Sequence, residues 1–134
     1  MKRFLLMTTC FAALGVTVVA QDDAEYQGWM KSVGATSGSL RKNLEAKNAD
    51  AAAADAKKLQ EIFGHVHDYW SGKHADDAMK FAMNAGMGFG EVAEQAAAGK
   101  FEEASATLKT TSSNCGGCHT AHREKAADGS WKIK

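Results

Sequence analysis

The chain has 134 residues, and its 16 Lys and Arg residues balance 16 Asp and Glu residues, so the formal net charge is zero. This length predicts one domain, and the lack of a basic excess argues against nucleic-acid binding. With 45% hydrophobic and 24% charged residues, the composition excludes a disordered, collagen-like or multi-span membrane chain. Proline is absent, alanine is abundant and β-branched residues are sparse. This balance favours long uninterrupted helices and predicts an all-α fold.

The first twenty residues have the pattern of a secretory signal peptide. Lys2 and Arg3 form a short positive segment, an apolar run follows, and Ala20 ends it at a small-residue cleavage site. The alternative, a transmembrane anchor, would need roughly 20 apolar residues, and this run is shorter. We therefore expect residues 1–20 to be removed on export to the periplasm. Residues 21–134 would then form a slightly acidic domain with no stable membrane insertion.

Four segments repeat apolar residues at alternating steps of three and four, which is the period of an amphipathic helix. They cover about 22–47, 51–72, 78–98 and 101–127 and are separated by capping and turn residues. Four helices with short connections predict an antiparallel up-down-up-down four-helix bundle. No segment is interpreted as a strand, and residues 131–134 are expected to form a tail. Several inward positions are Ala, Ser or Thr, and such thin filling indicates that something else occupies part of the interior.

The pentapeptide at 115–119 is C-G-G-C-H, which matches C-x-x-C-H, the attachment sequence of a c-type haem. On a helix, Cys115, Cys118 and His119 share one face. Two thiols can therefore bond to the haem vinyl groups while the imidazole reaches the iron. Gly116 and Gly117 carry no side chain that would obstruct a macrocycle lying against the helix. The motif predicts one covalently bound haem c.

Three other interpretations of the two cysteines are weaker. A disulfide would close a very short loop, and a helical pair three residues apart has poor disulfide geometry. A thioredoxin-like redox pair is expected in a βαβ unit, which this sequence does not predict. A zinc site would need two further ligands. The histidines at 65, 67, 74 and 122 do not have metal-type spacing.

Met30 is the candidate for the sixth iron ligand. The first and last helices of an up-down bundle are antiparallel neighbours, so a residue early in the first lies level with one late in the last. Met30 and His119 meet this condition, which predicts His/Met ligation and a raised reduction potential. The alternative is that Met30 is a core side chain beside an open iron site. The methionines at 79, 83 and 87 are interpreted as pocket wall or surface, because their row is offset from the inward stripe.

Two residues beyond the motif are further candidates near a haem. Arg123 lies one turn after His119 and could form a charge-assisted hydrogen bond with a haem propionate, with a solvated arginine as the alternative. His122 lies on the inner stripe, where it could touch the haem, and a packed or partly solvated histidine is the favoured interpretation. The charges at this end of the bundle are mixed in sign and indicate no particular partner.

An export signal, four helices and C-x-x-C-H close to the C-terminus resemble the cytochrome c prime family, the class II c-type cytochromes, across the whole mature chain. After Cys118 the sequence H-T-A-H-R is similar to the family pattern His-x-x-aromatic-Arg, with Arg123 matching and His122 at the aromatic position. The sequence M-K-S-V-G from Met30 is similar to Met-Lys-x-x-Gly of the low-spin members, in which that methionine binds the iron. A basic residue frequent one turn earlier in the family is Tyr26 here.

The motif and the resemblance together imply a one-electron carrier rather than an enzyme. A His/Met-ligated haem c would cycle between ferric and ferrous iron and exchange electrons with redox partner proteins. A five-coordinate haem that binds nitric oxide or carbon monoxide is the alternative function. A small catalytic haem protein is less favoured, because no distal acid–base pair can be assigned. Family members often pair through their first two helices, so a homodimer is compatible with the resemblance.

Overall fold

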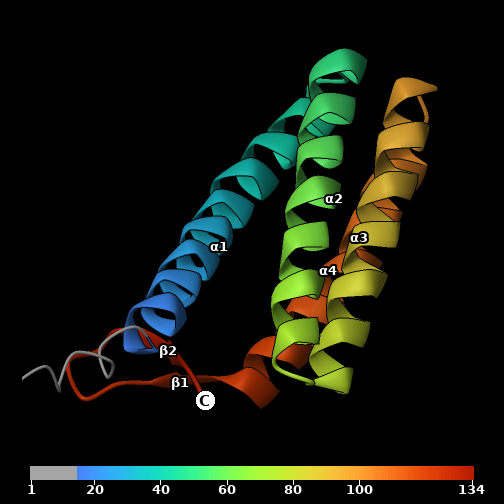
Figure 1. Ribbon diagram of the computed structural model, residues 1–134. Helices are drawn as coiled ribbons and strands as arrows, with labels where there is room; N and C mark the ends of the chain where they lie inside the picture. Colours follow the sequence, from blue (N-terminus) through green and yellow to red (C-terminus); the bar gives the residue numbers. More distant parts are fainter. Residues whose placement is uncertain (1–14) are drawn as a thin grey trace, which may run out of the picture.

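Four helices and one short hairpin make up the fold in the computed structural model, which describes residues 15–134, with side chains from residue 22 onward. The helices are α1 (Gly15–Glu45), α2 (Ala49–Gly72), α3 (Asp76–Ala97) and α4 (Phe101–His122). They run alternately up and down (Figure 1). The predicted all-α class is confirmed, apart from the two strands described below, and the arrangement is compatible with a four-helix bundle. Cys10 and residues 1–14 of the predicted signal peptide lie outside the described residues.

The start of α1 differs from the prediction. The helix begins at Gly15 rather than near residue 22, so the predicted cleavage site at Ala20 lies within continuous helix. The sequence between them holds neither proline nor a second glycine that would end a helix. Removal of residues 1–20 stays a prediction.

Each of the three helix connections turns through one residue with positive φ: Lys47, His74 and Gly99. A single left-handed residue commonly ends a helix, and glycine is its usual identity. The predicted end of the third helix at Gly99 follows this rule. Lys47 and His74 are not residue types that predict the end of a helix. Asn48 then caps α2, because its Oδ1 accepts a hydrogen bond from the backbone N–H of Ala51 at 3.2 Å.

The predicted continuation of the last helix to about residue 127 is wrong, and so is the predicted tail. Helix α4 ends at His122, and strand β1 (Arg123–Lys125) pairs antiparallel with β2 (Trp131–Ile133). In the turn between them, Asp128 Oδ1 accepts hydrogen bonds from the backbone N–H of Ser130 at 2.9 Å and from its hydroxyl at 2.6 Å. Gly129 supplies the positive φ of 84°. A D-G-S turn signal was present, but strands this short carry no period-two pattern.

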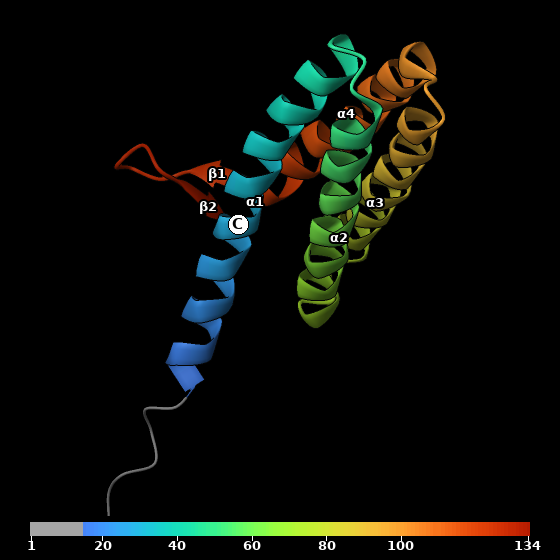
Figure 2. The same cartoon turned by 90° about the horizontal axis from the view of Figure 1, so that it is seen from above.

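Helix packing is uneven around the bundle. α2 and α3 make the most extensive contact, α1 packs on α2, and α4 packs on α3, whereas α1 and α4 contact each other little. Figure 2 shows α1 leaning away from the other helices, with the hairpin beside it. The largest fully buried side chains are Phe89, Leu40, Leu59 and Val92, and alanine supplies much of the remaining core. The space between α1 and α4 is therefore left unfilled by core side chains.

None of the helices in the described part of the chain combines the length and the apolar character needed to cross a membrane.

Candidate functional site

A cavity of about 580 Å³ lies between α1, α4 and the hairpin. This volume falls in the range of small-molecule and cofactor sites. Its wall is mainly apolar and includes Val33, Phe63, Val66, Phe81 and Ile133. All five predicted site residues line this one cavity: Met30, Cys115, Cys118, His119 and Arg123. The motif on α4 and the methionine on α1 are thus brought together.

The two cysteines are half-buried free thiols one turn apart on α4. Burial raises the pKa of the Cys115 thiol. The pKa of Cys118 is raised to about 11, first by burial and then by the negative charge of Asp77. Redox-active and metal-binding cysteines need the thiolate and have lowered pKa values. The thiols of Cys115 and Cys118 are therefore protonated at neutral pH. This form suits a reaction in which the S–H group adds to another molecule.

His119 lies one residue after Cys118 and is half-buried in the cavity wall. Burial lowers its pKa, and the positive charge of Arg123 lowers it further. The imidazole is therefore neutral at physiological pH, and a neutral ring nitrogen is the form that binds a metal. Within the described side chains, no group of three or more His, Cys, Asp or Glu residues is placed to hold a metal ion.

Met30 reaches the cavity from α1, where it is half-buried and packs against the core. The other methionines of the described chain belong to α3. Met83 and Met87 are 50% and 67% exposed, and neither lines the cavity. They are surface residues, in agreement with the prediction that their row is offset from the inward stripe.

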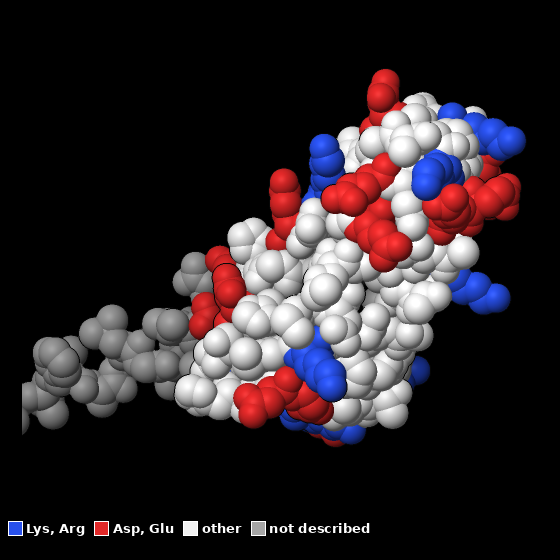
Figure 3. All heavy atoms as spheres, turned by 90° about the vertical axis from the view of Figure 1, so that its right-hand side faces the viewer, with Lys and Arg blue, Asp and Glu red and all other residues white. Residues whose placement is uncertain are grey.

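Figure 3 views the molecule from the side of α3 and shows charged side chains gathered towards the ends of the helices.

Arg123 is the first residue of β1 and lines the cavity. Its guanidinium carbon lies 3.9 Å from the ring centroid of Trp131. Its Nε atom is buried and has no hydrogen-bond partner among the described residues. A buried donor without a partner is costly, so this atom suits an acceptor held in the cavity. Lys31 and Lys132 are the other charged lining residues apart from histidine, and among the described residues no Asp or Glu lines the cavity.

An aromatic cluster at one end of the cavity was not predicted. Tyr26 and Tyr69 pack with ring centroids 4.5 Å apart, and the Trp70 ring lies 5.7 Å from that of Tyr26. The Tyr69 hydroxyl donates to Asp23 Oδ1 at 2.5 Å, which ties α2 to α1. Tyr26 and Trp70 belonged to the predicted inward stripes. Their contacts could not be predicted from local sequence patterns, because the hydrogen-bonded partners lie more than 40 residues apart in the sequence.

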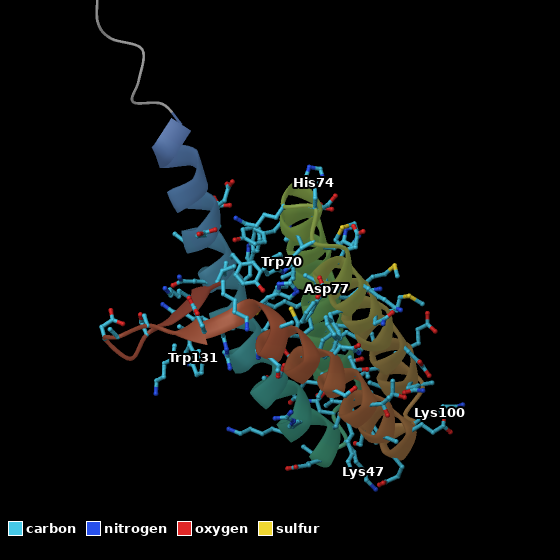
Figure 4. The ribbon with its side chains drawn as sticks, turned by 90° about the horizontal axis from the view of Figure 1, so that it is seen from below. Lys47, Trp70, His74, Asp77, Lys100 and Trp131 are labelled. Atoms are coloured by element: carbon cyan, nitrogen blue, oxygen red, sulfur yellow. The ribbon has the colours of Figure 1, made fainter. Side chains whose placement is uncertain are left out.

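His122 and Asp77 connect the other two helices at the same end. His122 Nε2 donates to Asp77 Oδ2 at 2.8 Å, and the His122 ring lies 4.8 Å from that of Trp70. Figure 4 shows Trp70 and Asp77 at this end and Lys47 and Lys100 at the opposite end. His122 is half-buried in the cavity wall, a position that fits a packed or partly solvated histidine.

The prediction about Gly117 needs a correction. A Cβ atom at this position would lie 2.6 Å from Cε1 of Phe81, so the glycine admits the Phe81 ring against α4. A Cβ at Gly116 would meet nothing within 4 Å. Only Gly116 leaves open space beside the helix. Phe81 was not singled out from the sequence, because it lies one position off the inward stripe of α3.

Comparison with known proteins finds no match. No family profile, no curated protein and no solved structure matches the chain. The resemblance to class II cytochromes c therefore rests on the motif residues and on their order along the chain.

Proposed function

We propose that this protein is a c-type cytochrome that carries single electrons and does no substrate chemistry. Cys115 and Cys118 would hold one haem c through thioether bonds, and His119 and Met30 would be its axial ligands. The observation that carries the proposal is that Cys115, Cys118 and His119 on α4 and Met30 on α1 line the same largely apolar cavity. The haem supplies a one-electron Fe(III)/Fe(II) couple when bound.

Three properties of the cavity support a haem rather than another ligand. Its wall is apolar, as a macrocycle requires, and its charged lining residues apart from histidine are cations, as two carboxylates require. Arg123 holds a buried N–H that lacks a protein acceptor. The neutral His119 ring and the protonated thiols are the forms in which these groups would take their assigned roles.

The chain's own residues would tune the iron site in two ways. Met30 and His119 come from two different helices that the bundle holds in place, so little rearrangement would accompany a change of charge. The apolar side chains Val33, Phe63 and Val66 line the cavity and would limit the access of water to a bound haem. Low polarity and a thioether ligand both raise a reduction potential, so we expect a potential above that of a solvent-exposed haem.

The deciding experiment is the optical spectrum of the protein made in an exporting host with a cytochrome c maturation system. Spectra of the oxidised and dithionite-reduced forms are recorded, and carbon monoxide is then added to the reduced form. A split low-spin spectrum that carbon monoxide leaves unchanged is expected. A high-spin spectrum that shifts on addition would favour the alternative of a five-coordinate haem that binds NO or CO. Absence of covalent haem would contradict both functions.

Two substitutions assign the ligands. Met30→Ala should convert the low-spin spectrum to a high-spin one, whereas Met83→Leu, at an exposed position outside the cavity, should leave it unchanged. Cys115→Ser and Cys118→Ser should each remove one thioether bond. An unchanged spectrum in Met30→Ala would remove this residue from the iron site.

The proposal includes export, a periplasmic location and exchange of electrons with redox partner proteins. Mass spectrometry of the mature protein should give a chain that starts at Gln21. Retention of residues 1–20 would contradict cleavage after Ala20. Sedimentation analysis would show whether the mature protein forms the homodimer compatible with the family resemblance.

A further inference from the structure

The C-terminal hairpin is part of the cavity wall, although the family pattern that follows the haem histidine ends at Arg123. Its second strand and the preceding turn residue contribute four lining residues: Ser130, Trp131, Lys132 and Ile133. The hairpin is fastened to the end of α4, because the backbone N–H of Lys134 donates to the His122 carbonyl at 3.1 Å. The Lys134 ammonium donates to the Thr120 carbonyl at 3.1 Å. These contacts hold the hairpin against the end of α4.

Trp131 covers one face of the Arg123 guanidinium. The guanidinium carbon lies 3.9 Å from the ring centroid, while Trp131 itself is 50% exposed. Stacking on an aromatic face fixes the plane of a guanidinium and leaves the N–H groups at its edge free to bind a carboxylate. The buried, unpartnered Nε of Arg123 is such a group. Trp131, a diagonal neighbour of Arg123 on the opposite strand, thus orients the arginine without using its donors.

Positive charge reaches the cavity from three elements. Lys31 lies on α1, Arg123 on β1 and Lys132 on β2. Lys132 is already paired with Glu124 at 3.0 Å, whereas no described residue neutralises Arg123. A cation in a largely apolar wall is costly to leave unpaired, so this side of the cavity is suited to an anionic group.

The geometry points to the hairpin as the wall that binds the carboxylate edge of the cofactor, with Arg123 in contact with a propionate and Trp131 as its positioning residue. This inference rests on the proposed function, because it takes haem c as the ligand of the cavity. It adds a residue outside the motif, Trp131, and it assigns a role to the segment that the family pattern does not cover.

A positive charge held beside the propionates favours the ferrous state, since reduction adds a negative charge to the site. Removing the guanidinium should therefore lower the reduction potential. Removing only the Trp131 ring should do the same, because the guanidinium loses its fixed plane. If Trp131 served only to stabilise the hairpin, its replacement would change the free energy of unfolding without changing the propionate environment.

The experiment uses the haem-loaded protein and two readouts, the midpoint potential and the propionate bending band in the resonance Raman spectrum. The variants are Trp131→Leu, Trp131→Phe and Arg123→Met. The control is Lys125→Ala, which removes another positive charge from the hairpin. The Lys125 ammonium lies 5.9 Å from the ring centroid of Trp131, but Lys125 does not line the cavity. Trp131→Leu and Arg123→Met should lower the potential and shift the band. Trp131→Phe and Lys125→Ala should stay close to wild type.

Wild-type values of both readouts in Arg123→Met would overturn the inference, even if Trp131→Leu failed to mature. A shift in Arg123→Met without one in Trp131→Leu would remove Trp131 as the positioning residue. These outcomes differ from failure of the proposed function, which would show as absence of covalent haem or as a high-spin spectrum of the wild-type protein. The band measures the propionates and does not depend on Met30 as a ligand.

Discussion

Trp70 donates a hydrogen bond from its indole Nε1 to the phenol oxygen of Tyr26 at 3.3 Å, and this bond joins α2 to α1 beside the candidate cofactor cavity. Both side chains are buried, with 3% and 7% of their surface exposed. Tyr26→Phe keeps the ring and removes only the acceptor, so the Trp70 N–H would be left buried without a partner. We expect the free energy of unfolding to fall by about 1–3 kcal/mol, the usual cost of such a donor.

Urea denaturation of the purified protein measures this effect. The matched control is Trp70→Phe, which removes the donor and should cost stability through lost packing volume. Once the donor is gone, Tyr26→Phe should add little to Trp70→Phe in the double variant, because the two residues share one hydrogen bond. Additive losses would mean that this bond contributes nothing to stability.

The two tyrosines of the aromatic cluster also predict how stability depends on alkaline pH. Burial raises the pKa of Tyr26 to about 12, although the hydrogen bond from Trp70 opposes the shift. Burial also raises the pKa of Tyr69, and its hydrogen bond to Asp23 adds to this shift. Phenols in an unfolded chain ionise near pH 10. The stability contributed by the neutral phenols is therefore fully present below pH 10 and is lost as pH rises towards 12.

Denaturation midpoints at pH 8, 9, 10 and 11 test this prediction. The midpoint should be steady up to about pH 9 and then fall. The fall should be smaller in a Tyr26→Phe, Tyr69→Phe double variant, which has no phenol at either position. An equal fall in the double variant would assign the alkaline effect to other groups.

Asp77 at the start of α3 predicts an effect at acid pH. Its hydrogen bond from His122 lowers the pKa of the carboxyl below its usual 3.8. A carboxylate only accepts hydrogen bonds, so Nε2 of His122 must carry the proton. Because the pKa is lowered in the folded state, the stabilisation is present above pH 3.8 and is lost as pH falls through the folded value.

Asp77→Asn should therefore lower the melting temperature slightly at neutral pH, and the difference from wild type should vanish once the pH falls below the lowered pKa of Asp77. Asp76→Asn is the control, because Asp76 also lies in the first turn of α3 but makes no contact with His122. Both variants lose the interaction of a carboxylate with the helix dipole. Equal melting temperatures for the two variants would show that the His122 contact adds nothing.

Local sequence patterns predicted that four helices form, but they predicted neither the start of α1, nor the end of α4, nor the hairpin. Apolar residues at steps of three and four predicted four helices, because each helix buries one continuous face. The turn at 128–130 was visible as D-G-S, but the strands on either side are held by cross-strand pairs such as Arg123 and Ile133. These pairs cannot be predicted from the spacing of apolar residues along the chain. The same is true of the stacking of Arg123 on Trp131, because it depends on tertiary contacts.

The candidate site was predictable to the extent that it depends on spacing along a helix. Cys115, Cys118 and His119 share a face of α4 because helical geometry requires it. Matching levels on the first and last helices predicted that Met30 lies near His119, and both line the cavity. The neighbour of Gly117 was not predictable, because Phe81 lies on another helix and its ring position depends on how α3 packs on α4.

Gly116 and Gly117 provide a matched pair for a final prediction. Alanine is favoured over glycine in a helix by about 1 kcal/mol, so Gly116→Ala, with open space around its Cβ, should raise the free energy of unfolding by up to that amount. At Gly117 the new Cβ would lie 2.6 Å and 2.8 Å from two atoms of the Phe81 ring, so the ring must move. Overpacking of this kind typically costs about 1–3 kcal/mol, and Gly117→Ala should be the less stable variant.

Urea denaturation of the two single variants measures the difference, and a Phe81→Leu background tests its cause. Leucine lacks the ring atoms that the Gly117→Ala methyl group would meet, so the cost of Gly117→Ala should shrink in that background while the effect of Gly116→Ala stays the same. Equal effects of the two alanines in the wild-type background would mean that the Phe81 ring moves aside without cost. In that case the packing of α3 on α4 would not explain the glycine at position 117.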